Sequence, residues 1–205
     1  MSFSLFISDL HLSPDRPSAS DALKRFLRNT APGAEALYVL GDLFEYWAGD
    51  DGLDQPFNGE VAREFDTLAR RGVRLRFMHG NRDFLIGARF ARESGMQLLS
   101  DPTLIDLYGS STLLMHGDTL CTDDVEYQRF RAMVRNPAIQ QAFLAKPLAE
   151  RVTTAQGFRG ESERAKQLKE MAIMDVAQAT VEGLTLVTMD EEIPKYASGR
   201  FRVVR

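Results

Sequence analysis

Cysteine is almost absent from this chain, whose 205 residues contain one, Cys121. A single cysteine excludes an intramolecular disulfide framework and is typical of a protein in a reducing compartment. Long hydrophobic runs are also missing, since no stretch reaches the roughly 18 apolar residues of a membrane span. The first apolar run follows Met1 and Ser2 directly, without the basic and apolar regions of a secretion signal. We therefore expect a cytoplasmic protein.

Histidine is scarce too, and all three histidines lie just after strand-like apolar runs. Four such runs end at residues with metal-binding side chains: Phe3–Ser8 before Asp9 and His11, Ala36–Leu40 before Asp42, Arg74–Met78 before His79 and Asn81, and Ser111–Met115 before His116. The carboxyl ends of parallel strands collect along one edge of a sheet, where α/β proteins usually place their sites. Because Asp9 and His11 are two positions apart, an extended backbone would point both side chains the same way.

This set of side chains indicates a metallohydrolase with two cations. Carboxylate, imidazole and amide oxygen suit an ion such as Mn²⁺ better than a structural, thiolate-rich zinc site. We expect Asp9 and His11 to hold one ion, Asn81 and His116 the second, and Asp42 to bridge them. A water molecule activated between the ions would attack a phosphorus atom, and Arg82 would clamp a phosphate bidentately.

Each of these residues also has an ordinary interpretation. Asp42 and Asn81 both follow a glycine and are common turn formers. A single histidine at a strand end is more often hydrogen-bonded structure than a ligand. His79 precedes its turn, so we expect it to support the loop from behind. We expect Asp83 and Asp118 to orient ligands rather than to bind metal.

The order of elements predicts an α/β fold with a helical insertion. Helices are expected over Ser20–Asn29, Val61–Arg71 and Phe84–Ser94, and a hairpin at Gly109-Ser110. After Asp123 the pattern is helical, with breaks at Asn136-Pro137, Lys146-Pro147 and Gly157–Gly160 before a longer helix over about 161–182. Closing strands are expected at Leu184–Met189 and Arg200–Val204. The resulting organisation is a core over 1–122, a helical cap over 123–170 and a shortened return to the core over 171–205.

Charge is unevenly distributed along the chain. The net charge is −4, but residues 125–171 carry nine Lys and Arg against five Glu. A basic segment beside an acidic rim would attract a phosphorylated substrate or an anionic lipid surface. Alternatively, these helical charges are simply solvated.

Four strings of the sequence resemble the calcineurin-like metallophosphoesterase superfamily. They are Ile7-Ser8-Asp9-Leu10-His11-Leu12, Gly41-Asp42-Leu43-Phe44-Glu45, His79-Gly80-Asn81-Arg82-Asp83-Phe84-Leu85-Ile86-Gly87 and Met115-His116-Gly117-Asp118-Thr119-Leu120-Cys121-Thr122-Asp123-Asp124. Within the superfamily they are most similar to the UDP-2,3-diacylglucosamine diphosphatases, because Arg82 stands where the wider superfamily usually has histidine. The resemblance resumes at Ala172–Val176 and covers about residues 3–187.

The resemblance implies a layered αββα sheet sandwich with an inserted helical cap. It also implies hydrolysis of the pyrophosphate bond of UDP-2,3-diacylglucosamine, by water attack on the α-phosphorus, to UMP and 2,3-diacylglucosamine 1-phosphate in lipid A biosynthesis. Family members use manganese, here two ions, and work as peripheral proteins at the cytoplasmic face of the inner membrane. No nucleic-acid partner is expected.

The resemblance assigns roles to individual residues. The metal ligands would be Asp9, His11, Asp42, Asn81 and His116, and the catalytic set Asp42, Asn81, Arg82 and His116. The substrate would be bound by Asn81, Arg82, Asp124, Ser162, Lys166 and Lys169. Apolar cap residues would shelter acyl chains, pack a small core of the cap, or do both: Phe130, Met133, Val134, Ile139, Phe143, Leu144 and Leu148.

The C-terminal part departs from the family pattern. A Gly-His-x-His loop that would complete both metal sites is absent, and Thr188-Met189-Asp190-Glu191-Glu192 stands in its place. A C-terminally shortened or altered product is the simpler expectation, although Asp190, Glu191 or Glu192 could replace the imidazoles. Two alternatives to the lipid A reaction therefore stay open. One is another metallophosphoesterase, and the other is a protein that binds the substrate without turnover.

Overall fold

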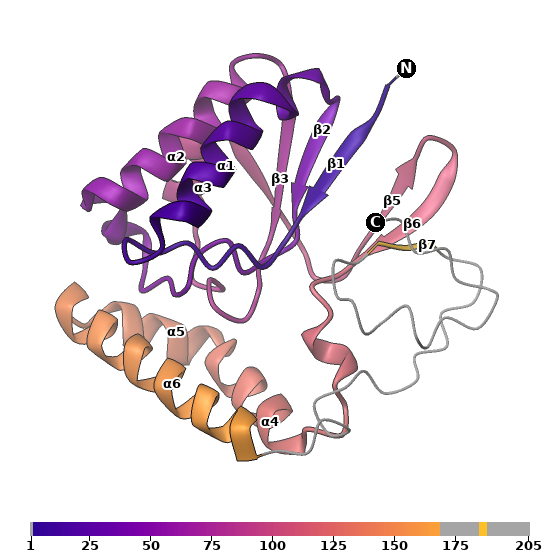
Figure 1. Ribbon diagram of the computed structural model, residues 1–205. Coiled ribbons are helices and arrows are strands. Elements are labelled where there is room, and N and C mark those ends of the chain that lie inside the picture. The colour runs from indigo at the N-terminus through magenta and orange to yellow at the C-terminus, as the bar shows by residue number, and fades with distance from the viewer. Residues whose placement is uncertain (1, 169–184, 188–205) are drawn as a thin grey trace.

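The computed structural model describes residues 2–168 and 185–187, and its first sheet positions most of the candidate site (Figure 1). This sheet has four parallel strands in the order β1-β2-β3-β4. The strands are β1 Ser4–Ile7, β2 Ala36–Val39, β3 Arg74–Met78 and β4 Met96–Leu99. One face of the sheet is covered by α1 Pro17–Asn29, α2 Pro56–Ala69 and α3 Ala88–Ser94. Short 3₁₀ turns occur at Ala31–Gly33, Asp50–Asp54 and Asp118–Leu120.

The second sheet carries the fourth candidate motif. It contains β5 Thr103–Leu107, β6 Ser110–Leu114 and β7 Thr185–Val187, in that order. The β5–β6 hairpin confirms the predicted turn, and β7 pairs parallel to β6 within the predicted strand Leu184–Met189. Leu40, Met78 and Leu114 form a separate buried cluster between the two sheets. The α/β class is therefore confirmed, with His116 approaching the first sheet from the second one.

The main core lies between the first sheet and its helices. Its largest fully buried side chains include Phe44, Phe65, Phe77 and Phe90. The Phe90 ring packs edge-on against Phe44 and Trp47, with ring centroids 5.7 and 5.2 Å apart. The described helices lie against this sheet or in the cap (Figure 1), so a second outer helical layer stays a prediction. The predicted strand Arg200–Val204 lies outside the described residues.

Helix starts differ from the expected ones for a simple reason. The first two helices begin at prolines, Pro17 and Pro56, because a proline ring suits the first helical turn, where its missing N–H is not needed. Ser20, at which this helix was expected to begin, is therefore an interior, buried residue of α1. The third helix begins at Ala88 rather than Phe84, since a turn closed by Ile86 N–H on the Asp83 carbonyl precedes it.

One strand was not predicted. After Gly95, which ends α3 in the left-handed conformation at φ 70°, Met96–Leu99 forms β4 at the edge of the sheet. Four residues without clear alternation carry little periodic signal. Only pairing with β3 defines this strand.

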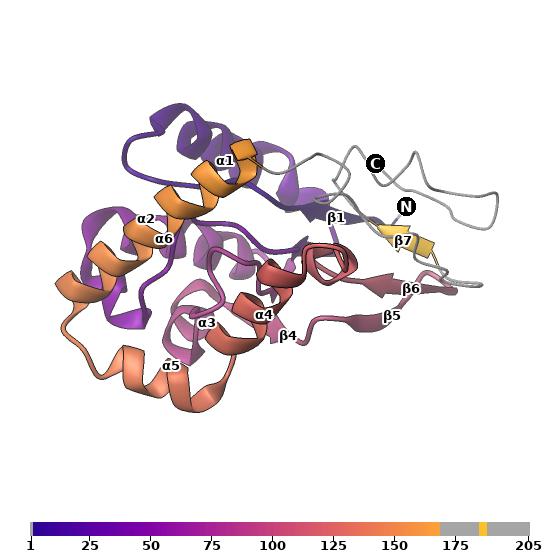
Figure 2. The same cartoon turned by 90° about the horizontal axis from the view of Figure 1, so that it is seen from below.

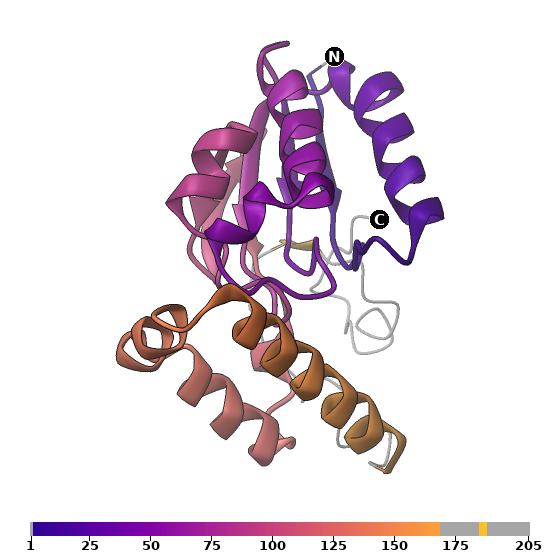
Figure 3. The same cartoon turned by 90° about the vertical axis from the view of Figure 1, so that its left-hand side faces the viewer.

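The cap consists of α4 Val125–Val134, α5 Pro137–Leu144 and α6 Leu148–Leu168. It lies beyond the carboxyl ends of the first sheet's strands (Figure 3), and in the view from below α6 runs diagonally above α5 while α4 lies to the right of α5 (Figure 2). The predicted break at Gly157–Gly160 is wrong, because α6 runs through both glycines. Glycine lowers helix propensity by about 1 kcal/mol without preventing a helix. None of the helices in the described ranges is both long and apolar enough to cross a membrane.

Replacing Gly157 with alanine is expected to raise the free energy of unfolding by about 0.5–1 kcal/mol. A Cβ at this position meets no atom within 4 Å, so the gain in backbone rigidity is not offset by a clash. Chemical denaturation would measure it. Gly72→Ala is the matched control, since its site is equally open but its φ of +92° strains any side chain. A loss of stability in Gly157→Ala would contradict a helix through this position.

Candidate metal centre

Three of the predicted ligands converge at the carboxyl edge of β1 and β2. The parallel pairing continues past the strands, since Asp9 N–H donates to the Gly41 carbonyl at 3.1 Å and His11 N–H to the Asp42 carbonyl at 2.9 Å. His11 Nε2 lies 3.9 Å from both Asp9 Oδ1 and Asp42 Oδ2. The ligand atoms of these three residues all lie within 4.8 Å of one another, an arrangement able to hold one cation.

The backbone that brings them together is not the expected extended one. Asp9, His11 and Asp42 have φ values of 56°, 47° and 53°, in the left-handed region. Asp and His tolerate this region better than most residues, although it costs conformational energy. Such strained residues persist where the surrounding structure fixes them, and they cluster at functional sites. The expectation that the side chains of Asp9 and His11 lie together is confirmed, but the expectation of an extended backbone at these residues was wrong.

Asp42 occupies the middle of the cluster. Its side chain is 5% exposed, and its Oδ1 accepts a hydrogen bond from Arg82 N–H at 2.9 Å. The Nε2 atom of His116 lies 3.9 Å from Asp42 Oδ1, on the other side from His11. Burial raises the pKa of Asp42, while the nearby His116 and the Arg82 hydrogen bond oppose this rise. A buried carboxylate between two imidazoles has the position that a bridging ligand needs.

His116 presents Nε2 because its other ring nitrogen is occupied. Nδ1 lies 2.9 Å from the Leu40 carbonyl, to which it donates, so the Nε2 lone pair is directed at the cluster. Burial lowers the pKa of His116, but the charges of Asp42 and Asp118 outweigh this and raise it overall. A hydrogen-bonded, oriented imidazole of this kind is what metal ligation requires.

One buried side-chain atom supports a cation site. Asn81 Oδ1 is buried without a hydrogen-bond partner, whereas most buried polar atoms have one. The Asn81 side chain hydrogen-bonds Tyr127, whose own hydroxyl donates to Asp118 Oδ2. The Asn81 amide oxygen is thus left for another ligand. Together with the imidazoles and carboxylates, this set of donors fits divalent cations with a preference for oxygen and nitrogen.

His79 supports its loop from behind, as predicted, and Asp83 holds the backbone of the loops that carry Asp42 and Asn81, in agreement with the orienting role expected of it. Asp83 is fully buried and accepts hydrogen bonds from the backbone N–H groups of Leu43 at 2.7 Å, Gly80 at 2.9 Å and Asp42 at 3.3 Å. Burial, followed by the charge of Asp42, raises the pKa of Asp83 to about 7. His79 Nε2 donates to the Ile86 carbonyl at 2.7 Å.

Two glycines allow the loops to approach closely. Gly41 has φ +94°, and a Cβ there would lie 2.6 Å from His116 Nδ1 and from Gly80 Cα. A Cβ on Gly80 would overlap Asp42 Oδ1 and lie 2.9 Å from Asp42 Cγ. The tight packing of Asp42 therefore depends on the missing side chain at position 80.

Replacing Gly80 with alanine is expected to reduce phosphoesterase activity about 10–100-fold, the usual range for disturbing a ligand's support. The added methyl group displaces the Asp42 carboxylate, so apparent cation affinity should fall in the same variant. Activity as a function of Mn²⁺ concentration would measure both. Gly109→Ala is the control, because an added Cβ there meets no atom within 4 Å and the residue lies in the β5–β6 hairpin, although its φ of +85° adds a strain that Gly80 does not have. Equal activity in the two variants would contradict this role of Gly80.

The predicted substrate residues are distributed more widely. Arg82 lies beside Asn81 and lines a groove, while Asp124 is buried and caps α4 by accepting from Tyr127 N–H at 3.1 Å. The backbone of α6 includes Ser162 and Lys166. Lys169 lies outside the described residues, as do Asp190, Glu191 and Glu192.

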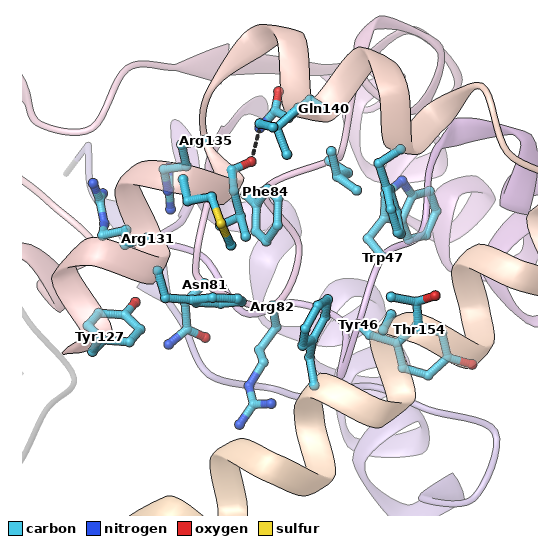
Figure 4. A pocket seen from close by; sticks show the side chains of 18 of the residues that line it. Tyr46, Trp47, Asn81, Arg82, Phe84, Tyr127, Arg131, Arg135, Gln140 and Thr154 are labelled. Atoms are coloured by element: carbon cyan, nitrogen blue, oxygen red, sulfur yellow. Dashed lines mark hydrogen bonds between the residues drawn. The ribbon is translucent and has the colours of Figure 1, made fainter.

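An apolar groove of about 560 Å³ lies between the cap and the core. Its core side is lined by Tyr46, Trp47, Phe84 and Leu85, and its cap side by Phe130, Met133, Val134, Ile139, Phe143 and Phe158. Figure 4 shows Asn81 and Tyr127 on one side of the groove and Trp47 and Thr154 on the other. Five of the seven predicted apolar cap residues line it, whereas Leu144 and Leu148 do not.

Sequence reasoning missed the groove residues Phe84, Leu85 and Phe158. Phe84 and Leu85 follow Asp83 directly and were assigned to a predicted helix. Apolar residues in such a helix are normally interpreted as core residues, not as the wall of a binding groove. The structure places them in the turn before α3, facing the cap. No local pattern distinguishes such residues from core, because the groove forms between distant segments.

Comparison with known proteins agrees with this geometry. The model of the family "Calcineurin-like phosphoesterase" matches residues 4–172. The chain is 53% identical over 178 residues to UDP-2,3-diacylglucosamine hydrolase of Serratia proteamaculans, covering 87% of this chain and 74% of that protein. It is 54% identical over 174 residues to the protein of the same name from Stenotrophomonas maltophilia, covering 85% and 69%. A crystal structure of Pseudomonas putida nuclease MPE has 18% identity and a TM-score of 0.38 over 53% of each chain, a likeness too weak to bear on function. By its family model and its relatives, this chain belongs to the calcineurin-like phosphoesterases.

Proposed function

We propose that this protein hydrolyses the pyrophosphate bond of UDP-2,3-diacylglucosamine, releasing UMP and 2,3-diacylglucosamine 1-phosphate in lipid A biosynthesis. The observation that carries the proposal is the position of the groove. Its lining includes Asn81 and Arg82 at one end and apolar side chains along the rest. A substrate with both a pyrophosphate and acyl chains would place each part against matching chemistry. The curated relatives are named for this substrate.

Five residues would hold two Mn²⁺ ions: Asp9, His11, Asp42, Asn81 and His116. When bound, divalent cations supply Lewis-acid stabilisation of phosphate charge and lower the pKa of a coordinated water. The protein's own part is to fix the donor atoms. Asp42 is fixed by its hydrogen bond from Arg82 N–H, and His116 by its hydrogen bond to Leu40.

Arg82 would bind a phosphate oxygen pair of the substrate. Its backbone is held by Asp42, and its guanidinium carries five donors suited to a bidentate contact. Asn81, Asp124, Ser162, Lys166 and Lys169 would complete the contacts to the uridine and glucosamine parts. The proposed roles of Ser162 and Lys166 are supported by the position of α6 beside the groove, since Thr154, Ala155 and Phe158 of this helix line its wall.

The apolar part of the groove would shelter the acyl chains. Phe130, Met133 and Ile139 remain 36%, 50% and 48% exposed although they face this groove, which is costly unless a ligand covers them. A substrate drawn from a bilayer would place the protein as a peripheral component at the cytoplasmic face of the inner membrane. The proposed organisation is a core over 1–122, a cap over 123–170 and a return to the core over 171–205.

The assay that tests this function follows UMP release from UDP-2,3-diacylglucosamine at increasing Mn²⁺, with His116→Ala as the background. We expect turnover that His116→Ala abolishes. Val134→Glu, at the groove wall, should lower turnover of the glycolipid about tenfold or more, since burying an unpaired charge against acyl chains is costly. It should leave hydrolysis of a soluble diester such as bis(4-nitrophenyl) phosphate unchanged. Val125→Glu, on the exposed side of the same helix, should change neither activity.

Other outcomes would identify the alternatives. Hydrolysis of the soluble diester without hydrolysis of the glycolipid would indicate another phosphoesterase. Binding of the glycolipid without turnover at any Mn²⁺ concentration would indicate a binding protein on the same scaffold.

A further inference from the structure

Arg131 of α4 and Arg135, the residue that caps the end of this helix, reach two different loops of the candidate metal centre. Arg131 Nε donates to Asp118 Oδ2 at 2.8 Å, and its Nη2 donates to Asp101 Oδ2 at 3.2 Å. One turn later, Arg135 Nη2 donates to the Gly80 carbonyl at 3.0 Å. The cap therefore contacts both the segment after β6 and the segment after β3 through charged groups.

The partners of Arg131 lie on either side of His116. Asp118 follows it by two positions, and Asp101 accepts a hydrogen bond from the His116 backbone N–H at 3.3 Å. The two carboxylate side chains are only 6% and 4% exposed, and the Arg131 side chain is 17% exposed. Burial raises the pKa of Asp118, but hydrogen bonds from Arg131 and Tyr127 lower it below its usual value. Arg131 therefore offsets the charge of two nearly buried carboxylates. Its removal would leave Asp118 with Arg135 Nη2, 3.9 Å from its Oδ2, as the remaining arginine, and would weaken the compensation of both carboxylates.

Arg135 acts on the neighbouring loop. Its partner, the carbonyl of Gly80, belongs to the residue before Asn81. Its guanidinium also lies 5.9 Å from the centre of the Phe84 ring, on the wall of the groove. The Asn81 side chain is held from the same helix, through Tyr127. Arg135 and Tyr127 thus both restrain the loop that carries Asn81.

We propose that Arg131 and Arg135 are positioning residues, by which the helical cap holds the loops of His116 and Asn81 in the geometry that binds a divalent cation. The inference rests on the proposed function, because it takes these two residues as ligands. Neither arginine needs to touch the cation. Each fixes a backbone segment whose free movement would spread the donor atoms and raise the entropy cost of binding.

The arrangement also joins the metal centre to the groove. Arg131 and Arg135 both line the groove while contacting the loops. A ligand that presses α4 against the core would strengthen the same contacts that hold His116 and Asn81. By reciprocity, occupancy of the cation site would tighten binding in the groove.

The test is a direct titration of the full chain with Mn²⁺. The electron paramagnetic resonance signal of the free ion measures how much Mn²⁺ stays unbound. We expect Arg131→Met and Arg135→Met to weaken Mn²⁺ binding about 10–100-fold, the range for residues that support ligands. Arg129→Met is the matched control, because Arg129 is an exposed arginine of the same helix. Asp101→Asn removes the charge that pairs with Arg131 and should also weaken Mn²⁺ binding, as Arg131→Met does. Unchanged affinity in Arg131→Met and Arg135→Met would overturn the inference.

A second measurement keeps the inference separate from the proposed function. Hydrogen exchange of residues 79–83 and 116–120 is followed without any metal in the same variants. We expect Arg131→Met to speed exchange over 116–120 and Arg135→Met to speed it over 79–83, each by about tenfold or more, with the remaining core unaffected. Exchange as slow as in Arg129→Met would overturn the positioning role, whatever the cation affinity. If the wild-type chain binds no Mn²⁺, the proposed function fails, and the exchange result still decides whether the arginines position the loops.

Discussion

Replacing Asp42 with asparagine is expected to reduce UMP release from UDP-2,3-diacylglucosamine by more than about 100-fold, since disturbing a ligand's support alone costs 10–100-fold. Among the described residues, Asp42 is the carboxylate that lies 3.9 Å from the imidazoles of both His11 and His116. An amide keeps one oxygen but loses the negative charge that would hold the two proposed cations together. Asn at this position retains the shape of the side chain and an oxygen to accept from Arg82 N–H.

Asp42→Asn distinguishes a loss of activity from a loss of stability. Burial of the Asp42 carboxylate raises its pKa, which means that the charge destabilises the metal-free fold. The melting temperature of metal-free Asp42→Asn should therefore equal or exceed that of the wild type, a usual relation at functional sites. Asp54→Asn serves as the control, because Asp54 pairs with Arg89 and its side chain is 73% exposed. Activity of Asp42→Asn within threefold of this control would show that Asp42 is not a ligand.

Replacing Asp83 with alanine is expected to lower the free energy of unfolding by about 3 kcal/mol or more, since each buried donor left unsatisfied costs about 1–3 kcal/mol. The side chain is fully buried and accepts from three backbone N–H groups, those of Asp42, Leu43 and Gly80. These groups belong to two loops, and both loops carry predicted ligands. Urea denaturation would measure the loss, and Mn²⁺-dependent activity at a temperature where the variant stays folded should fall as well.

Asp50 offers a matched control for this experiment. Its carboxylate accepts from the backbone N–H groups of Gly87, Arg89 and Phe90 at 2.9–3.1 Å and from Trp47 Nε1 at 3.1 Å, and none of these is a predicted metal ligand. Because Trp47 lines the groove, activity is measured here with a soluble diester, and Asp50→Ala should lose comparable stability without a comparable loss of this activity. If both variants lose activity equally when folded, Asp83 has a structural role alone.

Much of the candidate site is visible in the sequence because its signals are local. Apolar runs followed by Asp9, Asp42, Asn81 and His116 mark strand ends. Parallel pairing of β1, β2 and β3 brings the first three to one edge, whereas His116 follows β6 of the second sheet, a placement that no local signal predicts. The β5–β6 hairpin and the helices α4 and α5 were predicted for the same reason, since a turn or a proline lies within a few residues of each boundary. The predicted starts of α1 and α2 were wrong, because Pro17 and Pro56 each begin the helix about a turn earlier at little energetic cost.

Tertiary structure alone decided the features that depend on distant segments. The strand β4 exists because Met96–Leu99 pairs with β3, and its own sequence has no clear period. The left-handed backbone at Asp9 and His11 follows from hydrogen bonds to the loop after β2. The contact of Arg135 with Gly80 joins residues 55 positions apart, and the groove likewise forms where the cap meets the core. The sequence by itself determined which residues stand at the strand ends, because that pattern is local. The orientation of these residues and their contacts with the cap depend on packing between distant segments, which no local sequence pattern predicts.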